Sequence, residues 1–460
     1  MTRLDEPERV DEPRATTHKL GRKEYLGYAA GDAANNLAFS MAGMFLLVYY
    51  TDVVGLAAGA VGTLFLVVRA FDAFADIFAG RMVDRTQTRW GKFRPFILFG
   101  SLPLLLLTVA LFSVPDMSDG ASLVYAYATY ALFGLTYSLV NIPYGSLATA
   151  MSQDPDERAK LASFRVTGTN LAILLLVLIV SPQIEGSSDL QRSLTITTSL
   201  LVVVGMALYL FTFFTAKEQV RRKEAKPSLR DVASTLKQNG PLLRLCLSSL
   251  LALTGLFCLQ TVGTYYAREV LGNATYFTAI IAVQTGGALV AAAIVPWLAS
   301  RFGKKVGYIA FAAVAVVGGV GVALVPASNA AVPIAFFGVL GLGVGVVTTL
   351  MWALEADTVE YGEWTTGTRT EGASYSVFSF TRKLSQAMGG AAAAWTIGIG
   401  GYVAGADVQS SEALDAIKFA AGGVPAIFFV LGAVIMLRYP LSEARFQEIV
   451  GDIAEHRDAG

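Results

Sequence analysis

Long apolar stretches recur along the chain and are separated by short polar segments. Each stretch is about 20 residues long, which as an α-helix matches the roughly 30 Å thickness of a bilayer core. A segment inside lipid must satisfy its own backbone hydrogen bonds, which favours helices over strands. The pattern predicts an all-α polytopic membrane protein with twelve helices, at roughly 25–50, 57–80, 94–114, 121–149, 160–182, 193–216, 241–266, 273–299, 306–326, 331–355, 372–402 and 414–438.

The composition agrees with this fold class. Hydrophobic residues make up 54% of the chain and charged residues 15%, whereas a soluble protein carries about 25% charged residues. The two histidines, His18 and His456, lie in the tails, which excludes imidazole as a base or metal ligand within the spans. We therefore expect no enzymatic activity, no cofactor and no nucleic-acid partner, and we expect a monomer surrounded by membrane lipids.

The distribution of lysine and arginine predicts the orientation of the chain. Of the 35 basic residues, 28 fall in the tails and in alternate loops, three in the opposite loops and four within the spans. The first 25 residues lack the apolar core and the cleavage site of a signal peptide. We expect a multi-pass protein of the bacterial cytoplasmic (inner) membrane with both termini in the cytoplasm.

The predicted spans divide into two sets of six. The longest cytoplasmic loop, 217–240, separates a first bundle at 25–216 from a second at 241–438, with tails at 1–24 and 439–460. A Gly-Lys pair opens the third and the ninth span, at Gly91-Lys92 and Gly303-Lys304, as an internal duplication requires. Parallel halves of this kind are a transporter architecture in which the substrate binds near the midplane, between the halves.

Three charged residues in the second span need an explanation, because placing a charged side chain in mid-bilayer costs at least about 2.5–3.5 kcal/mol of free energy. Arg69, Asp72 and Asp76 lie on one stripe of the helix. The two carboxylates can bind a monovalent cation such as Na⁺, or one of them can carry a proton. The alternative is a structural network of ion pairs between helices.

Further polar side chains lie in the first, fourth and fifth spans. Asp32 and Asn36 can bind sugar hydroxyls, as can Tyr137 in the fourth span. The oxygens of Ser138 and Asn141 extend the cation site, and Asn141 also belongs to the substrate site. Hydrogen bonding between helices is the alternative for all of them. Arg165, one turn into the fifth span, is either an anchor for a polar or anionic ligand or a partner for an acidic residue.

The eleventh span carries two adjacent basic residues. Ser379 and Lys383 face one way, and Arg382 lies about 100° round the helix. An unpaired ammonium at the depth of Lys383 is so unfavourable that we expect Asp72 or Asp76 to pair with it. A cation that competes for those carboxylates would then couple ion binding to sugar binding.

Charges of opposite sign flank the cytoplasmic ends of the two halves. We expect them to form ion pairs that close the inner face in the outward-open state, although solvated loop charge is the alternative. The residues are Asp84, Arg85, Arg89 and Arg158 in the first half and Asp357, Glu360 and Glu363 after the tenth span.

Several segments resemble the glycoside–pentoside–hexuronide:cation symporters of the major facilitator superfamily. The matching stretches run nearly end to end: GDAANN, YYTDVVG, FDAFAD, TRWGKFRPF, NIPYGSLATAM, MWALEADTVEYGE and EGASYSVFSFTRK. Within that family the long motifs are most similar to those of the bacterial glucuronide carriers. The resemblance implies the major facilitator fold and cation-coupled sugar transport.

The resemblance also implies roles for individual residues. By comparison with melibiose-type members, Asp72 and Asp76 would hold the cation with Ser138 as a hydroxyl ligand, and Lys383 would couple the cation to the sugar. Asp32 and Arg165 would match sugar-binding positions and Tyr137 a residue that lines the pocket.

The sequence departs from the melibiose-type pattern at three positions. Asn141 replaces an aspartate that contacts sugar, Gly145 replaces a tryptophan, and Arg382 replaces an apolar residue. The loss of a carboxylate and the gain of a guanidinium favour a glucuronide, with Arg382 or Arg165 as the partner of its carboxylate.

We therefore expect symport of a glucuronide with H⁺ or Na⁺ by alternating access. A symporter or uniporter for a neutral glycoside or pentoside is the main alternative. A membrane-embedded prenyltransferase is a remote one, because Asp72-AFA-Asp76 resembles one aspartate-rich diphosphate motif but lacks a second motif facing it.

Overall fold

The computed structural model describes residues 19–152, 155–218, 238–367, 371–406 and 408–459, and every regular element in these ranges is a helix. The first half contains α1 (Arg22–Val48) with a π-helical turn η1 (Tyr49–Val53), α2 (Ala58–Arg85), α3 (Arg94–Leu111), α4 (Asp119–Met151), α5 (Pro155–Gly186) and α6 (Leu190–Thr215).

The second half repeats this order. It contains α8 (Gly240–Tyr265) with a π-helical turn η2 (Tyr266–Val270), α9 (Tyr276–Phe302), α10 (Lys304–Leu324), α11 (Ala331–Thr366) and α12 (Glu371–Ile399). A final span is built from α13 (Ser411–Lys418), η3 (Phe419–Gly423) and α14 (Val424–Leu437), and α15 (Glu443–Ala459) follows it.

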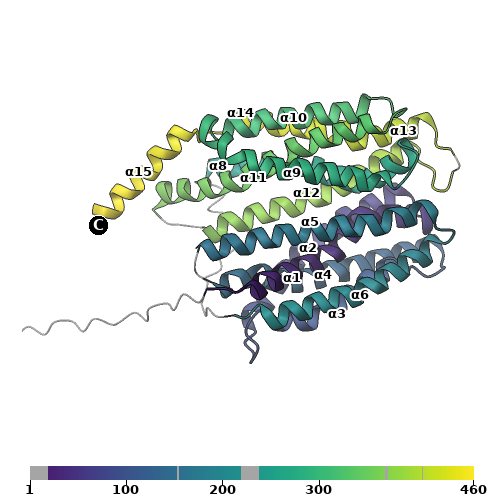
Figure 1. Cartoon of the computed structure of the whole chain (residues 1–460), viewed down its shortest axis with the longest axis horizontal. Coiled ribbons are helices and arrows are strands. Elements are labelled where there is room, and N and C mark those ends of the chain that lie inside the picture. Colours follow the sequence, from purple (N-terminus) through teal and green to yellow (C-terminus); the bar gives the residue numbers. More distant parts are fainter. Residues whose placement is uncertain (1–18, 153–154, 219–237, 368–370, 407, 460) are drawn as a thin grey trace, which may run out of the picture.

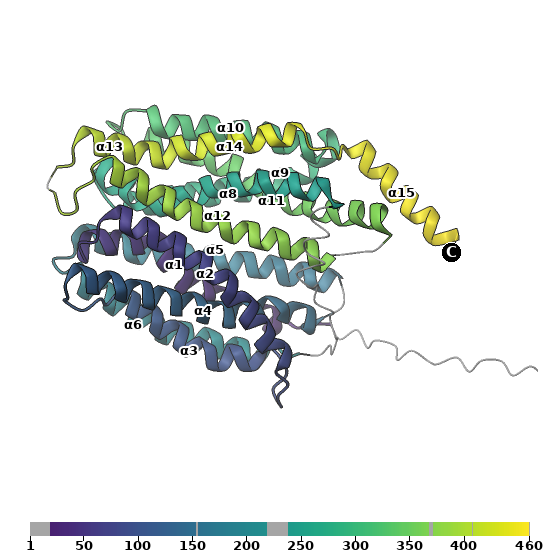
Figure 2. The same cartoon turned by 180° about the vertical axis from the view of Figure 1, so that it is seen from behind.

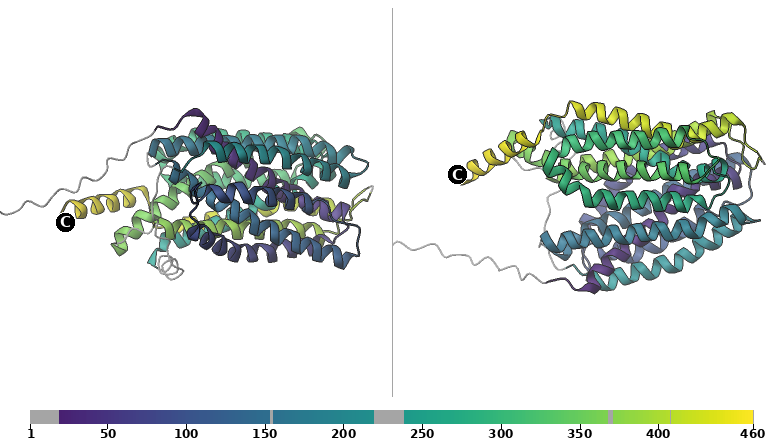
Figure 3. Two further views of the ribbon diagram at one scale, coloured as in Figure 1. Left: turned by 90° about the horizontal axis from the view of Figure 1, so that it is seen from below. Right: turned by 45° about the horizontal axis from the view of Figure 1, so that its top comes forward.

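The helices form two bundles that lie side by side. Figure 1 shows the first half, purple to teal, below the second half, green to yellow, with all long helices running along one direction. The view from behind in Figure 2 and the right-hand view in Figure 3 show the same separation. The start of α1 and the projecting α15 lie at one end of the molecule, and α13 lies at the other.

Three helix pairs join the halves: α2 packs against α12, α1 against α8 and α5 against α9. Glycine permits close approach at the largest of these interfaces. A Cβ on Gly62 of α2 would lie 2.9 Å from the Trp395 ring of α12, and one on Gly390 of α12 would lie 3.2 Å from the Phe65 ring of α2. Small residues at helix contacts are typical of membrane bundles.

The outer faces of the bundles are apolar. Val203, Phe214, Leu289 and Trp297 are each more than 60% exposed. Side chains of this kind lose nothing in contact with acyl chains, so the surface fits a protein whose surroundings are lipid.

The predicted spans agree with the helices to within a few residues at most ends. Nine spans in the described residues are long and apolar enough to cross a membrane by composition alone. The three long helices outside that set, α1, α2 and α12, are those that carry Asp32, Asp72 and Lys383 near their middles. Their 27 to 29 residues correspond to about 40 Å, so polar content rather than length sets them apart.

One predicted boundary was wrong. The tenth span was expected to end near residue 355, but α11 continues to Thr366 and includes Asp357, Glu360 and Glu363, which had been assigned to a loop. Its last turns keep one buried face, formed by Leu354, Thr358 and Gly362, which sustains the helix after the apolar run has ended. The tail after residue 439 contains the helix α15.

The segment that connects the halves is fastened at both ends. The Glu218 carboxylate accepts hydrogen bonds from the backbone N–H groups of Lys92, Phe93 and Arg94, at 2.8, 2.7 and 3.1 Å, which satisfies free donors at the start of α3. On the other side, the Asn239 side chain accepts from Leu242 N–H at 3.0 Å and donates to the Thr358 carbonyl at 2.7 Å.

Candidate functional site

Arg69 and Asp72 form an enclosed ion pair on α2. Arg69 Nη1 donates to Asp72 Oδ2 at 2.9 Å, and the two side chains are 11% and 5% exposed. The guanidinium carbon lies 5.3 Å from the centre of the Phe39 ring and 5.6 Å from that of Tyr130. Aromatic faces stabilise a desolvated cation, so Asp72 has a counter-ion held in place by its own surroundings.

Asp76, one turn further along α2, joins three helices. Lys383 of α12 donates to Asp76 Oδ2, and Ser138 of α4 donates to Oδ1 at 2.6 Å. The Asp76 and Lys383 side chains are 25% and 23% exposed, so this pair is more open than the one at Asp72. The expected pairing of Lys383 with one of the two carboxylates is confirmed at Asp76, and it links the two halves.

A glycine makes room for the second oxygen of Asp72. Asp72 Oδ1 is buried and makes no hydrogen bond. It packs against Gly134 of α4, where an added Cβ would lie 2.0 Å from it. Among the described residues there is no group of three or more His, Cys, Asp or Glu that could hold a metal ion.

Asp32 of α1 accepts hydrogen bonds from several side chains of its own half. Arg165 Nε of α5 donates to Asp32 Oδ1 at 3.0 Å, and Thr169, one turn further along α5, donates to Oδ2. Asn36 Nδ2 donates to the Asp32 carbonyl at 2.9 Å and to Oδ2 at 3.2 Å. Asp32 is 3% exposed, whereas the Arg165 side chain is 40% exposed. The exposed group that a ligand can reach is therefore the guanidinium, with Asp32 behind it.

Thr169 was not predicted from the sequence. It lies four residues after Arg165, on the same face of α5, and its hydroxyl holds the carboxylate that in turn holds Arg165. Spacing of i, i+4 from a charged residue in a span is the signal that could have found it.

Tyr137 of α4 lies where these groups converge. Its ring packs against those of Phe39 and Phe133, with ring centres 5.1 and 6.2 Å apart. Phe39 also lies under the Arg69 guanidinium, so the Tyr137 ring belongs to the aromatic cluster beside the Arg69–Asp72 pair.

Arg382 differs from the other basic residues of the site. Its Nε is buried and has no hydrogen-bond partner in the described part of the chain. It precedes Lys383 on α12, whose ammonium is paired with Asp76. Of the four basic residues within the spans, Arg382 is the one for which the described residues provide no carboxylate.

Two predicted ligands lie near this cluster without joining it. Asn141 is half-buried, one turn beyond Ser138 on α4, and within the described residues it makes no hydrogen bond to Asp72 or Asp76. Ser379 is half-buried one turn before Lys383 on α12. Their roles as cation and substrate ligands stay predictions.

The residues predicted to close the cytoplasmic face contact their own halves. Asp357 accepts two hydrogen bonds from Lys304 Nζ, at 2.7 and 2.8 Å, instead of pairing across the midline. Arg158 donates to the Ser152 carbonyl at 2.8 Å, and Arg89 lies over the Trp90 ring.

The remaining members of that set leave the prediction open. Arg85 is exposed at the end of α2, Glu360 and Glu363 are half-buried in the last turns of α11, and the Asp84 side chain lies outside the described side chains. Pairing across the midline in the outward-open state therefore stays a prediction.

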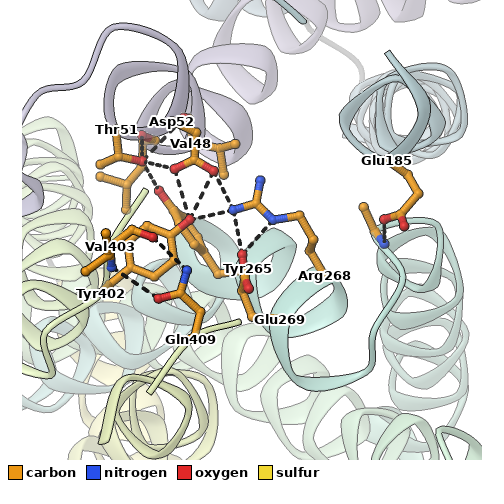
Figure 4. A network of polar contacts seen from close by, with 12 residues as sticks. Val48, Thr51, Asp52, Glu185, Tyr265, Arg268, Glu269, Tyr402, Val403 and Gln409 are labelled. Atoms are coloured by element: carbon orange, nitrogen blue, oxygen red, sulfur yellow. Dashed lines mark hydrogen bonds and ion pairs between the residues drawn. The ribbon is translucent and has the colours of Figure 1, made fainter. Parts of the chain in front are cut away.

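A polar network at the opposite end was not predicted. Arg268 of η2 forms an ion pair with Asp52 of η1, and the Tyr402 hydroxyl donates to both Asp52 oxygens at 3.0 Å. Thr51 and Tyr265 share a hydrogen bond of 2.7 Å beside them. Figure 4 shows these side chains converging from the first and the second half.

The comparisons with known proteins agree with this architecture. The model of the MFS/sugar transport protein family matches residues 27–443. The chain is 45% identical over 439 residues to the glucuronide carrier protein homolog of Escherichia coli K12, an alignment that covers 95% of this chain and 96% of that protein. It is 33% identical over 422 residues to the inner membrane symporter YicJ of the same strain, covering 91% and 92%.

A solved structure supports the fold. The crystal structure of a bacterial homolog of the human lysosomal transporter Spinster, in an inward-facing conformation, has a TM-score of 0.68 at 13% identity and covers 92% of this chain and 100% of that one. At that identity the likeness concerns the fold alone. Together with the family match and the two relatives, it means that this chain belongs to the MFS/sugar transport protein family and is a multi-pass inner-membrane transporter rather than an enzyme.

Proposed function

We propose that the protein is a cation-coupled symporter of a sugar that carries one carboxylate, a glucuronide. The observation that carries the proposal is the charge balance of the site. Asp32 is paired with Arg165, Asp72 with Arg69 and Asp76 with Lys383, while the described residues provide no carboxylate for Arg382. Arg382 is half-buried and its Nε is buried without a hydrogen-bond acceptor, and a monoanionic ligand would supply that acceptor and balance the charge.

The guanidinium of Arg382 suits a carboxylate ligand. Its parallel N–H groups match the two oxygens of a carboxylate, and such charge-assisted bonds are about twice as strong as neutral ones. Arg165 is the weaker candidate, because its Nε is already committed to Asp32. We assign the sugar carboxylate to Arg382, and the ring hydroxyls to the exposed face of Arg165 and to Tyr137.

The Asp76–Lys383 pair provides a route for coupling. A proton or Na⁺ that binds at Asp76 competes with Lys383 for the carboxylate, and Ser138 supplies a further oxygen to the cation. Lys383, once released, stands next to Arg382 and adds a second positive charge beside the substrate anion. Each ligand therefore favours the binding of the other, as reciprocal linkage requires.

The membrane orientation completes the proposal. With both termini in the cytoplasm, the end that contains η1 and η2 faces the periplasm, and substrate and cation enter there and leave at the end that contains α15. The protein acts as a monomer, and it uses no cofactor other than its coupling cation.

Uptake of labelled glucuronide into proteoliposomes tests the proposal. We expect accumulation against the glucuronide gradient when a proton or sodium gradient is imposed, and none without one. Equilibration without accumulation under either gradient would favour a uniporter.

Arg382→Gln separates the anionic substrate from a neutral one. Loss of a hydrogen bond to a charged group costs about 1.5–3 kcal/mol, which raises the half-saturating concentration of the glucuronide roughly 10- to 150-fold. Arg382→Lys is the matched control that keeps the charge and should retain part of the affinity. Equal effects of Arg382→Gln on a glucuronide and on the corresponding neutral glycoside would contradict the assignment.

A further inference from the structure

The first helix of each half ends in the same way. Both α1 and α8 pass into a five-residue π-helical turn, which begins at Tyr49 in the first half and at Tyr266 in the second. From these tyrosines the segments read YYTDVVG and YAREVLG, and each ends on a glycine with positive φ, +81° at Gly55 and +76° at Gly272. π-helical turns within membrane-length helices are rare and often lie at functional positions.

Asp52 and Glu269 occupy equivalent places in this repeat, because each is the fourth residue of its π-helical turn and lies three residues before the glycine. Arg268 lies where the first half has Thr51, so the basic residue is present in the second half alone. The structure brings Arg268 and Asp52 together as an ion pair between the halves, with side chains 21% and 9% exposed. The pair therefore joins the π-helical turn of one half to that of the other.

Further bonds hold this pair. The Tyr402 hydroxyl, from the segment after α12, donates to both Asp52 oxygens at 3.0 Å and accepts from Arg268 at 2.5 Å. Beside them the Thr51 and Tyr265 hydroxyls share their 2.7 Å bond, and these two residues are 2% and 0% exposed. The labelled side chains in Figure 4 show how the network spans η1, η2 and the segment that contains Tyr402.

A closed apolar contact lies beneath the network. The Phe45 ring of α1 meets the Phe277 ring of α9 edge-on at 5.9 Å, and the two residues are 0% and 1% exposed. Thr264 of α8 approaches the Met44 carbonyl of α1 at 3.5 Å. Along the chain Met44 and Phe45 lie between Asp32 and Asp52, so these buried contacts join the two halves between the level of Asp32 and that of the network.

We propose that Asp52, Arg268 and Tyr402 form the latch of the outer gate, the closure at the end opposite the chain termini. The proposal rests on the proposed function in that alternating access requires such a closure. Entry from this side requires the Asp52–Arg268 pair to break and η1 to separate from η2.

Glu269 is a second partner for Arg268 in the latch. Arg268 also donates to Glu269 of its own half, at 2.8 Å from Nε, and the second ion-pair contact is 2.7 Å. When η1 and η2 separate, Arg268 keeps Glu269 as a partner, so opening does not leave the guanidinium unpaired. Glu269 therefore competes with Asp52 for the guanidinium and favours the open state, whereas Asp52 and Tyr402 favour the closed state.

Thiol labelling tests the latch without reference to any substrate. The buried Cys246 and Cys258 are replaced by serine or alanine, and Ser379→Cys provides a reporter at the level of Lys383. The rate at which a membrane-impermeant maleimide reacts with this cysteine is measured in right-side-out and in inside-out vesicles.

Removal of one side of the latch should expose the reporter. We expect Asp52→Asn, Arg268→Gln and Tyr402→Phe each to raise the labelling rate in right-side-out vesicles, about tenfold for the two charge variants, which corresponds to about 1.4 kcal/mol. Glu269→Gln should lower it. The double variant Asp52→Asn with Arg268→Gln should match either single variant, because both remove the same pair.

Asp415→Asn is the matched control, since Asp415 forms an exposed ion pair with Lys418 within α13, at the same end of the molecule. It should leave the labelling rate unchanged. Thermal melting of each variant in detergent checks that it is folded.

Three results would overturn the latch: labelling rates unchanged in all latch variants, additive effects in the double variant, or acceleration in inside-out vesicles alone. Intact glucuronide accumulation with unchanged labelling would overturn the latch and leave the proposed function standing. Glucuronide transport is measured in protein that retains Ser379, because Ser379 is a predicted substrate ligand. Accelerated labelling of the reporter variants, together with no glucuronide transport by the protein that retains Ser379, would support the latch and refute the proposed substrate.

Discussion

Two ion pairs join the halves of this transporter, and their surroundings differ. Asp76–Lys383 lies mid-membrane, with both side chains about a quarter exposed at 25% and 23%, and with the unpartnered Arg382 next in sequence. Asp52–Arg268 lies at one end and is held by Tyr402, with side chains 9% and 21% exposed.

In the proposed mechanism an ion pair between the halves serves coupling at one place and gating at the other. In that mechanism the mid-membrane pair exchanges partners with a small cation beside Arg382, so it responds to ligands. The end pair lies beside buried contacts and, as the proposed latch, responds to the relative position of the halves. Variants that affect one pair and spare the other separate coupling from gating.

The largest effect is expected for Asp76→Asn. The amide cannot neutralise Lys383 or bind a cation as a carboxylate does, so gradient-driven accumulation should fall to the level of vesicles without a gradient. Exchange of labelled for unlabelled substrate should persist, because the latch is untouched. The measurement is uptake and exchange in the same proteoliposomes, and undiminished accumulation would eliminate Asp76 as the coupling residue.

Gly134→Ala should weaken coupling through Asp72. The added Cβ would lie 2.0 Å from Asp72 Oδ1, so the carboxylate must move, and such overpacking costs about 1–3 kcal/mol of stability. We expect a lower melting temperature together with a severalfold loss of accumulation. Gly145→Ala is the control, since nothing lies within 4 Å of a Cβ at that position of the same helix. Wild-type behaviour of Gly134→Ala would show that the position of Asp72 is unimportant.

Asp52→Asn should change rates while it spares coupling. Loss of the latch alters the balance of inward- and outward-facing states, so initial uptake should change a few-fold. The final accumulation ratio should equal that of the wild type, because the cation site is intact and that ratio is set by the imposed gradients. A reduced ratio would place Asp52 in the coupling machinery, and a time course of uptake distinguishes the two outcomes.

Thr169→Val should have a smaller effect than these. The hydroxyl that holds Asp32 is lost while the shape is nearly kept, and a hydrogen bond of this kind contributes about 1 kcal/mol. We expect about a fivefold rise in the half-saturating concentration of the sugar with an unchanged maximal rate. Thr167→Val, on an exposed face of α5, is the control that should change neither.

Much of the fold could be predicted from the sequence because each span carries its own signal. The twelve apolar stretches give the helices, and the cost of an unpaired ammonium gives the pairing of Lys383 with Asp76. The extension of α11 could not be predicted in this way, since hydropathy falls along Asp357–Glu363 while packing continues on one face.

The parts of the site that sequence reasoning missed depend on distant contacts. Nothing local assigns Phe39 and Tyr130 to the two sides of Arg69, because they come from different helices. The Asp52–Arg268 pair joins residues far apart in sequence, and no local pattern assigns them to each other. Asp32 was expected to face the sugar, and only the structure places three donors around it.

The anchors at Glu218 and Asn239 bear on how the transporter can be assembled. Each fastens one end of the connecting segment to its own half, so a peptide bond between them adds little to the structure of either bundle. Two fragments expressed separately and divided within that segment should find each other in the membrane through the α2–α12, α1–α8 and α5–α9 contacts and recover uptake. The two halves would then behave as two subunits that associate through their own interfaces, although they are translated as one polypeptide.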